Sequence, residues 1–258
     1  MFRGVNSVDH AFFVQLSTVA RAAIVAELAA GIHPENKDQD GFDPVTEADR
    51  AAERALRNVI EQAFPDHGIC GEEYGLVRGD ARTRWSLDPV DGTRALVCGL
   101  PSWAVLVGLL EDGRHIAGMI DLPAVDERLV AVESVTLRNG KAVAASHCRT
   151  IADARWSTTD PYLFDGAEAE AVARVRAAAK VARYGLDAMA YARVATGDID
   201  LVVENKLMPH DLDALVAVVR GAGGTFGDWD GGEDFSHGRV IAAATRALYD
   251  EAVALLAG

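Results

Sequence analysis

Two aspartates, a proline, a glycine and a threonine stand together in the segment Asp88-Pro89-Val90-Asp91-Gly92-Thr93. An apolar stretch ends at Leu87, so Asp88 is expected at the C-terminal end of a β-strand. Gly92 permits a conformation that a Cβ atom would forbid, and Thr93 can begin a helix whose backbone N–H groups attract anions. Carboxylate oxygens bind hard cations such as Mg²⁺, often together with a substrate phosphate. The segment therefore predicts a metal-assisted phosphate site, although the same residues would also form an ordinary turn.

Further acidic residues stand at predicted strand ends and helix starts. Glu72 and Glu73 follow one predicted strand. Asp49 and Asp211 each lie at the beginning of a predicted helix. A single acid in such a place is usually a helix-terminus charge. Four such places in one acidic chain favour a centre that binds more than one metal ion.

Apolar spacing and turn residues divide the chain into two halves. Residues 1–150 combine two helices with a run of strands as an α+β unit, whereas residues 151–258 alternate helices and strands as an α/β unit. We therefore predict two domains with a boundary near residue 150. Helices are predicted at 8–30, 46–64, 167–179, 187–196, 212–220 and 246–256. Strands are predicted at 67–71, 85–87, 104–110, 116–122, 128–132, 180–184, 199–203 and 240–243, a loop at 35–44, and hairpin turns at Gly113 and Asn139-Gly140.

The composition is that of an acidic globular protein. The 258 residues include 39 Asp and Glu against 25 Lys and Arg, which gives a formal net charge of −14. Such a surface repels nucleic acid and anionic lipid, whereas a bound metal can still attract a small phosphorylated ligand. Three widely spaced cysteines predict neither a disulfide framework nor a zinc site. The first residues do not resemble a signal peptide and the uninterrupted apolar runs are too short to span a bilayer, so a cytoplasmic location is expected.

These acidic segments, in this order along the chain, resemble the motifs of the inositol monophosphatase-like phosphatases, which are Mg²⁺-dependent and lithium-sensitive. The resemblance covers residues 44–224, and only the segment at 88–93 is specific when taken singly. It implies a layered αβαβα sandwich of the inositol monophosphatase and fructose-1,6-bisphosphatase type. The matching segments are Pro44 to Asp49, Gly71 to Glu73, Trp85 to Thr93, Gly99 to Trp103, His210 to Ala214 and Gly221 to Gly224.

The resemblance implies two to three Mg²⁺ ions per site. Glu72, Asp88 and the carbonyl of Val90 would bind the first ion. Asp88, Asp91 and Asp211 would bind the second ion. A third, more weakly bound ion would be coordinated by Glu72 and water. Inhibition by Li⁺ is expected for the same reason.

The resemblance also implies how a phosphate ester would be held and hydrolysed. The backbone N–H groups of Gly92 and Thr93 would hold the phosphate. Glu72 and Thr93 would orient the attacking water, and Asp49 would support that water or Thr93. No phosphoenzyme is needed for this chemistry, so no nucleophilic Cys or Ser is expected. Roles for Lys37 and His210 are left open.

Two further acids favour one substrate within the family. Asp187 and Glu204 stand where the resemblance places contacts to the alcohol part of the substrate, and the segments around them look most like the histidinol-phosphate phosphatase branch. Histidinol phosphate carries an ammonium group and an imidazole, which two carboxylates would complement. The alternative roles are a helix N-cap for Asp187 and a solvated strand end for Glu204.

Three functions therefore stay open, in descending order of preference. The first is hydrolysis of L-histidinol phosphate. The second is the same chemistry on inositol 1-phosphate or on another small sugar or nucleotide phosphate. The third is an RNA- or transcription-associated role known among relatives, which the acidic charge disfavours. A homodimer is expected because dimers are common in the family.

Overall fold

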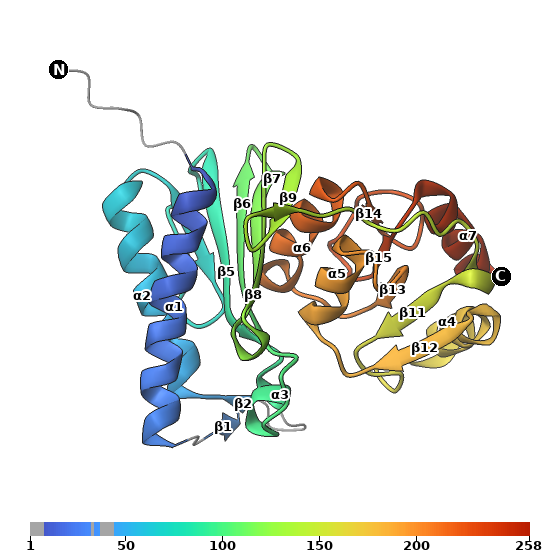
Figure 1. Cartoon of the computed structure of the whole chain (residues 1–258), viewed down its shortest axis with the longest axis horizontal. Helices are drawn as coiled ribbons and strands as arrows, with labels where there is room; N and C mark the ends of the chain where they lie inside the picture. The colour runs from blue at the N-terminus through green and yellow to red at the C-terminus, as the bar shows by residue number, and fades with distance from the viewer. Residues whose placement is uncertain (1–7, 32–33, 37–43) are drawn as a thin grey trace.

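The computed structural model of the chain describes residues 8–31, 34–36 and 44–258. Two sheets alternate with three helical layers, which is the predicted αβαβα arrangement (Figure 1). Lys37 and most of the loop predicted at 35–44 lie outside the described residues. The helical layers are α1 (His10–Ala30) with α2 (Glu47–Ala63), α5 (Ala188–Ala195) with α6 (Pro209–Gly221), and α4 (Gly166–Ala178) with α7 (Arg246–Ala257).

The larger sheet separates the first two helical layers. Its strands are antiparallel except that β3 runs parallel to β5. In spatial order they are β10 (Lys141–Ala142), β9 (Val135–Arg138), β8 (Glu127–Val132), β7 (Arg114–Leu122), β6 (Ala104–Glu111), β5 (Thr83–Asp91), β3 (Gly68–Gly71) and β4 (Gly75–Val77).

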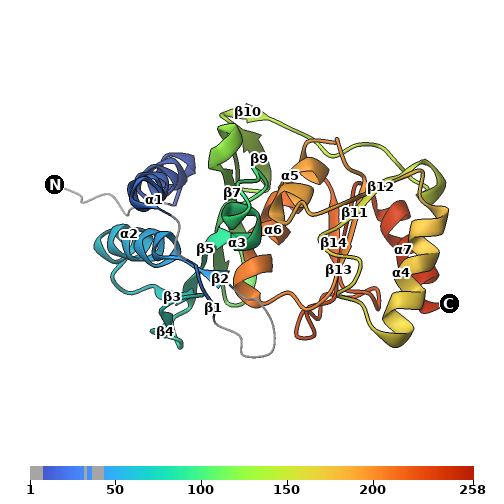
Figure 2. The same ribbon diagram turned by 90° about the horizontal axis from the view of Figure 1, so that it is seen from below.

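The smaller sheet lies between the middle helices and the outer pair α4 and α7 (Figure 2). Strand β11 is parallel to both of its neighbours, and the other pairs are antiparallel. The order is β12 (Val181–Tyr184), β11 (Arg155–Thr158), β13 (Leu201–Glu204), β15 (Val240–Ala243) and β14 (Thr225–Gly227). Short elements complete the fold: β1 (Glu35–Asn36) paired with β2 (Pro44–Val45), α3 (Thr93–Val97), and 3₁₀ turns at Pro123–Val125 and Ile151–Asp153.

Three apolar cores fill the spaces between these layers. The first joins α1 and α2 to one face of the larger sheet, and the third joins α4 and α7 to the outer face of the smaller sheet. The middle core is shared, because α5 and α6 belong to the second half of the chain and pack on strands of both sheets. The chain crosses from β10 to β11 around the predicted boundary at residue 150. That the halves are separate domains stays a prediction.

The predicted helices and strands are present, with ends displaced by at most four residues. The turns at Gly113 and Asn139-Gly140 are confirmed and join β6 to β7 and β9 to β10. The prediction was wrong about the strand at 85–87, which runs from Thr83 to Asp91 and so carries both aspartates within it. Strands β1, β2, β4, β9, β10, β11 and β14 were not predicted, because each has only two to four residues and little periodicity. The loop prediction at 35–44 was wrong at its two ends, where β1 and β2 pair with each other.

Helix α1 is a weak candidate for a membrane span. Among the described residues it is the one helix long and apolar enough by length and composition, although polar residues interrupt its apolar runs. Its buried residues Phe13, Leu16 and Ile24 belong to the first core, and its Arg21 donates to Asp121 of β7 at 2.8 Å. A core helix of a globular protein passes the same test.

Candidate metal and phosphate site

The end of β5 places two aspartates on one cavity. Its pairing with β6 shifts register between Asp88 and Asp91, where three residues of β5 match two of β6. This bulge bends the strand end, so that both side chains line the same cavity. The Val90 N–H donates to Asp88 Oδ1 at 3.0 Å and fixes that carboxylate. Asp91 Oδ2 accepts from the Ala188 N–H at 2.7 Å, at the beginning of α5.

Helix α6 brings a third aspartate to these two. Asp211 lies in its first turn, where Oδ2 accepts from the Met208 N–H at 2.7 Å. The helix lies close to the larger sheet because β6 and β7 present glycines to it. A Cβ atom at Gly108 would lie 2.8 Å from Asp213 Cβ, and one at Gly118 would lie 2.6 Å from the Ala214 carbonyl oxygen. Because Gly108 and Gly118 have no side chain, α6 can approach the sheet closely, and this approach places Asp211.

Asp88, Asp91 and Asp211 form a cluster that fits a hard cation. One carboxylate oxygen from each lies within 4.8 Å of the others. Burial and then the neighbouring carboxylates raise the pKa of Asp88 and Asp91 well above the usual range. Like charges crowded at low dielectric repel one another, and a divalent ion relieves that repulsion while using oxygen donors. The residues present therefore suit a metal of the Mg²⁺ class.

Glu72 lies on the same cavity but outside that cluster. It follows β3, and its N–H donates to the Leu87 carbonyl at 3.1 Å. The turn after it is held by Glu53 of α2, whose buried carboxylate accepts from the Glu73 N–H at 2.7 Å and from Arg57 Nε at 2.7 Å. Gly71 leaves room for this carboxylate, because a Cβ atom there would overlap it.

A hydrogen bond connects Thr93 to Asp49, which is one of the two contacts that the resemblance implies for Asp49. The Thr93 hydroxyl lies 3.0 Å from the Val90 carbonyl oxygen and 3.3 Å from Asp49 Oδ1. The other oxygen of Asp49 accepts from the Thr46 N–H at 2.9 Å, as part of a capping box at the beginning of α2. Burial is the main cause that raises the pKa of Asp49. Gly92, with φ of 78°, precedes Thr93 at the beginning of α3.

The cavity has a volume of about 310 Å³ and lies between the two sheets. The predicted residues on its wall are Glu72, Asp88, Val90, Asp91, Gly92, Thr93, Asp187, Glu204 and Asp211. Asp49 reaches the cavity only through Thr93. His210 is outside the lining, with Nε2 3.4 Å from Asp211 Oδ1. The structure thus gathers the predicted residues at one place, while their roles stay predictions.

Asp187 occupies the cap position of α5 without acting as a cap. Its backbone has a φ of 47°, and its side chain makes no hydrogen bond to the helix. Oδ2 instead accepts from the Ser102 hydroxyl at 3.3 Å. A Cβ atom on Gly92 would lie 3.0 Å from this carboxylate. Burial raises the pKa of Asp187, against the hydrogen bond from Ser102 and the charge of Arg94.

Glu204 ends β13 inside the protein, so the alternative of a solvated strand end is wrong. Its side chain is 2% exposed and accepts from the Thr159 N–H at 2.6 Å and the Thr158 hydroxyl at 3.3 Å. Burial raises its pKa to about 7. The carboxyl group therefore titrates near neutral pH at the wall of the cavity.

Sequence reasoning missed three groups around the site. Glu53 supports the turn that carries Glu72, and Tyr191 and Asn205 line the cavity. For Tyr191 a signal was available, because it stands four residues after Asp187 on one helix face. For Glu53 the local pattern shows only an ion pair with Arg57 four residues later, because the backbone N–H groups that it holds in the turn are 20 and 21 residues away.

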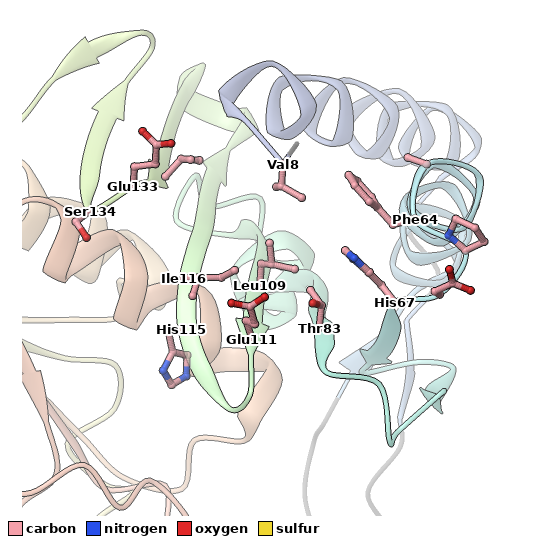
Figure 3. Close-up of a pocket in the computed structure, with 14 residues that line it drawn as sticks. Val8, Phe64, His67, Thr83, Leu109, Glu111, His115, Ile116, Glu133 and Ser134 are labelled. Carbon is pink, nitrogen blue, oxygen red and sulfur yellow. The ribbon is translucent and has the colours of Figure 1, made fainter. Parts of the chain in front are cut away.

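A second cavity, about 790 Å³, lies near the beginning of β5 (Figure 3). Its wall includes Phe64, His67, His115 and Glu111. His67 stacks on Phe64 with centroids 4.7 Å apart and accepts from Trp85 Nε1 at 3.1 Å. None of the predicted site residues lies on this wall. Volume alone would therefore select a cavity that lacks the acidic cluster.

The profile of the inositol monophosphatase family matches residues 7–257. The chain belongs to the inositol monophosphatase family. It is 42% identical over 197 residues to the bifunctional phosphatase IMPL2, chloroplastic, of Arabidopsis thaliana, a match that covers 75% of this chain and 57% of that protein. It is 34% identical over 225 residues to a histidinol-phosphatase of Streptomyces coelicolor, covering 83% and 84% of the two chains.

Solved structures of the family have the same fold. An inositol monophosphatase from Zymomonas mobilis superposes with a TM-score of 0.85 at 35% identity, covering 96% of each chain. This similarity confirms the predicted layered architecture. Relatives named for histidinol phosphate and for inositol phosphate are about equally similar to this chain, so similarity alone does not choose the substrate.

Proposed function

We propose that this family member is a Mg²⁺-dependent phosphomonoester hydrolase that converts L-histidinol phosphate and water to L-histidinol and phosphate. The observation that supports this choice of substrate is the pair of carboxyl groups, Asp187 and Glu204, on the cavity wall beside the metal-site acids. Both are largely removed from solvent, where a carboxylate gains more from a cationic partner than it does in water. The histidinol-phosphatase named above supports the proposal.

The proposed chemistry divides among the residues already described. Bound Mg²⁺ would neutralise the phosphate dianion, lower the pKa of water and stabilise the leaving oxygen. The Thr93 hydroxyl donates its proton in a hydrogen bond to the Val90 carbonyl or to Asp49, which leaves its oxygen free to accept a hydrogen bond from the attacking water and so to orient it. The backbone N–H groups of Gly92 and Thr93 hold the phosphate in front of α3.

The second candidate is inositol 1-phosphate, which the similarity to the Zymomonas mobilis enzyme favours. A polyol would need hydroxyl partners rather than negative charge. An ester with two phosphates is less suitable, because a second phosphate requires a cluster of basic side chains. The cavity offers Arg94 and Lys206, and Lys206 Nζ already lies 3.3 Å from Asp165.

The proposal retains the expected partners, location, oligomeric state and inhibitor of the enzyme. A small phosphorylated substrate, no membrane or nucleic acid partner, a cytoplasmic location, a homodimer and inhibition by Li⁺ all stay predictions. The net charge of −14 supports the exclusion of nucleic acid.

Phosphate release from L-histidinol phosphate and from inositol 1-phosphate, each with Mg²⁺ and with EDTA, tests the proposal. We expect Mg²⁺-dependent turnover with kcat/KM higher for histidinol phosphate. A preference for inositol phosphate would retain the metal chemistry and overturn the substrate. Turnover that survives EDTA would overturn the metal.

A further inference from the structure

Two buried polar atoms on the cavity wall lack a partner in the part of the chain that the structure describes. They are the hydroxyl of Tyr191 and Oδ1 of Asn205. Tyr191 is 2% exposed and Asn205 is 3% exposed. Buried polar groups in proteins are almost always hydrogen-bonded, so an unpartnered one at a cavity indicates that a ligand or water supplies the partner.

The Tyr191 hydroxyl is held in place and keeps a proton that it can donate. The phenol ring belongs to the middle core and stacks on Phe226 with ring centroids 6.0 Å apart, which holds the ring in place. Burial and the nearby carboxylates, Glu204 foremost, raise the pKa of Tyr191 well above its usual value. The hydroxyl therefore keeps its proton at every pH at which the enzyme would work.

Asn205 is fixed as an acceptor. Its Nδ2 donates to Glu168 Oε2 at 2.7 Å and to the Leu163 carbonyl at 3.3 Å. Both of these partners accept only, so the amide cannot be turned over to exchange its nitrogen for its oxygen. Oδ1 is consequently left as an acceptor for a donor that the protein does not provide among its described residues.

We propose that Tyr191 and Asn205 are specificity-determining residues, which bind the alcohol part of the substrate through one donor and one acceptor. Tyr191 stands one helical turn after Asp187, and Asn205 follows Glu204, so each neutral group adjoins one of the two acids. The inference rests on the proposed function only in placing a phosphate ester in this cavity. It adds that the leaving alcohol carries both an acceptor and a donor. The imidazole of histidinol has a bare nitrogen and an N–H, which meets this requirement.

The substitution Tyr191→Phe removes one oxygen and keeps the ring. We expect KM for L-histidinol phosphate to rise about tenfold, the effect of losing one hydrogen bond to substrate, with kcat nearly unchanged. Ethyl phosphate, whose leaving group has no polar atom besides the ester oxygen, should show no change. Since the hydroxyl has no partner among the described residues, the melting temperature without substrate should not fall.

Asn205→Ala also loses the bonds to Glu168 and Leu163, so this variant is expected to be less stable. Its readout is therefore the ratio of kcat/KM for histidinol phosphate to that for ethyl phosphate, which does not depend on the fraction of folded enzyme. We expect this ratio to fall about tenfold. Calorimetric titration of L-histidinol in the presence of inorganic phosphate gives a readout apart from turnover, and Tyr191→Phe should weaken that binding.

The outcomes separate the inference from the proposed function. If the wild type prefers inositol phosphate, the proposed substrate fails, and the same comparison with ethyl phosphate still decides the inference. Equal changes on both esters would overturn it. So would a melting temperature lowered by Tyr191→Phe, because the hydroxyl would then serve a structural water. Absence of both turnover and histidinol binding in the wild type would overturn both.

Discussion

The two walls of the cavity hold their carboxylates in different ways. On the wall formed by the larger sheet and the start of α6, Asp88, Asp91 and Asp211 approach one another, and burial with mutual repulsion raises the pKa of the first two. On the wall formed by the smaller sheet, Glu204 accepts two hydrogen bonds from Thr158 and Thr159. A cation would relieve the repulsion between the carboxylates of the first wall, whereas on the second wall burial raises the pKa of Glu204 and the hydrogen bonds from Thr158 and Thr159 oppose it. Under the proposed function, chemistry and substrate choice would thus belong to different walls.

The largest effect on activity is expected from a substitution in the first wall. Asp88→Asn removes an oxygen that the proposed metal ions would share, and we expect Mg²⁺-dependent phosphate release to fall about 1,000-fold, since metal assistance supplies several kcal/mol. Relief of repulsion should at the same time raise the melting temperature in EDTA. Asp80→Asn, at an exposed position, is the control and should change neither. A variant with lower metal-free stability would contradict this account of the cluster.

The buried Glu204 of the second wall should make the free energy of unfolding depend on pH. The pKa of Glu204 is raised from 4.5 to about 7, so its protonated form is favoured on folding. The stabilisation is complete below pH 4.5 and is lost as the pH rises to about 7. Relative to Glu204→Gln, the wild-type free energy of unfolding should decrease by about 2 to 3 kcal/mol between pH 5 and pH 8. Denaturant titration at several pH values measures this, and a difference independent of pH would refute it.

The next largest effect is expected from Glu53, which holds the turn after Glu72. Glu53→Gln weakens the buried contacts to Arg57 and the turn after Glu72, and we expect a loss of about 2 kcal/mol in unfolding free energy with weaker Mg²⁺ binding. Glu61→Gln is a matched change on the same helix, where an exposed pair to Arg78 should contribute less than about 0.5 kcal/mol. Chemical denaturation and Mg²⁺ titration compare the two. Equal losses would show that Glu53 does not support the turn.

The smallest effect concerns charge at the cavity wall. Asp187→Ala should raise KM for L-histidinol phosphate about tenfold and leave KM for inositol 1-phosphate nearly unchanged, because only the former carries a cation. Asp250→Ala, on an exposed face of α7, serves as a control for loss of one negative charge. The measurement is steady-state kinetics on both esters. Equal increases in KM would remove the argument from charge for the substrate.

The difference between the walls also explains what the sequence could predict. Asp88, Asp91 and Thr93 lie within one short segment, so their types and spacing already indicate phosphate chemistry. For Tyr191 the spacing from Asp187 is a weak signal, because a tyrosine in an apolar helix is also ordinary core by pattern. Asn205 joins it on the cavity wall only when α5 and β13 come together. Glu204 could be placed by resemblance, but its burial and raised pKa depend on Thr158 and Thr159, some 45 residues earlier. Local spacing predicts what local geometry positions, and the remainder depends on long-range packing.

The position of α6 between the sheets has a consequence for synthesis of the chain. Leu106, Ile120 and Leu129 of the larger sheet belong to the core that α6 completes. The larger sheet ends at Ala142 and α6 ends at Gly221, so roughly 80 residues must follow before that face can be covered. At ribosomal rates of about 5 to 20 residues per second, this takes roughly 4 to 16 seconds. During that interval the nascent sheet exposes an apolar face, and a chaperone that binds such surfaces would meet its substrate there.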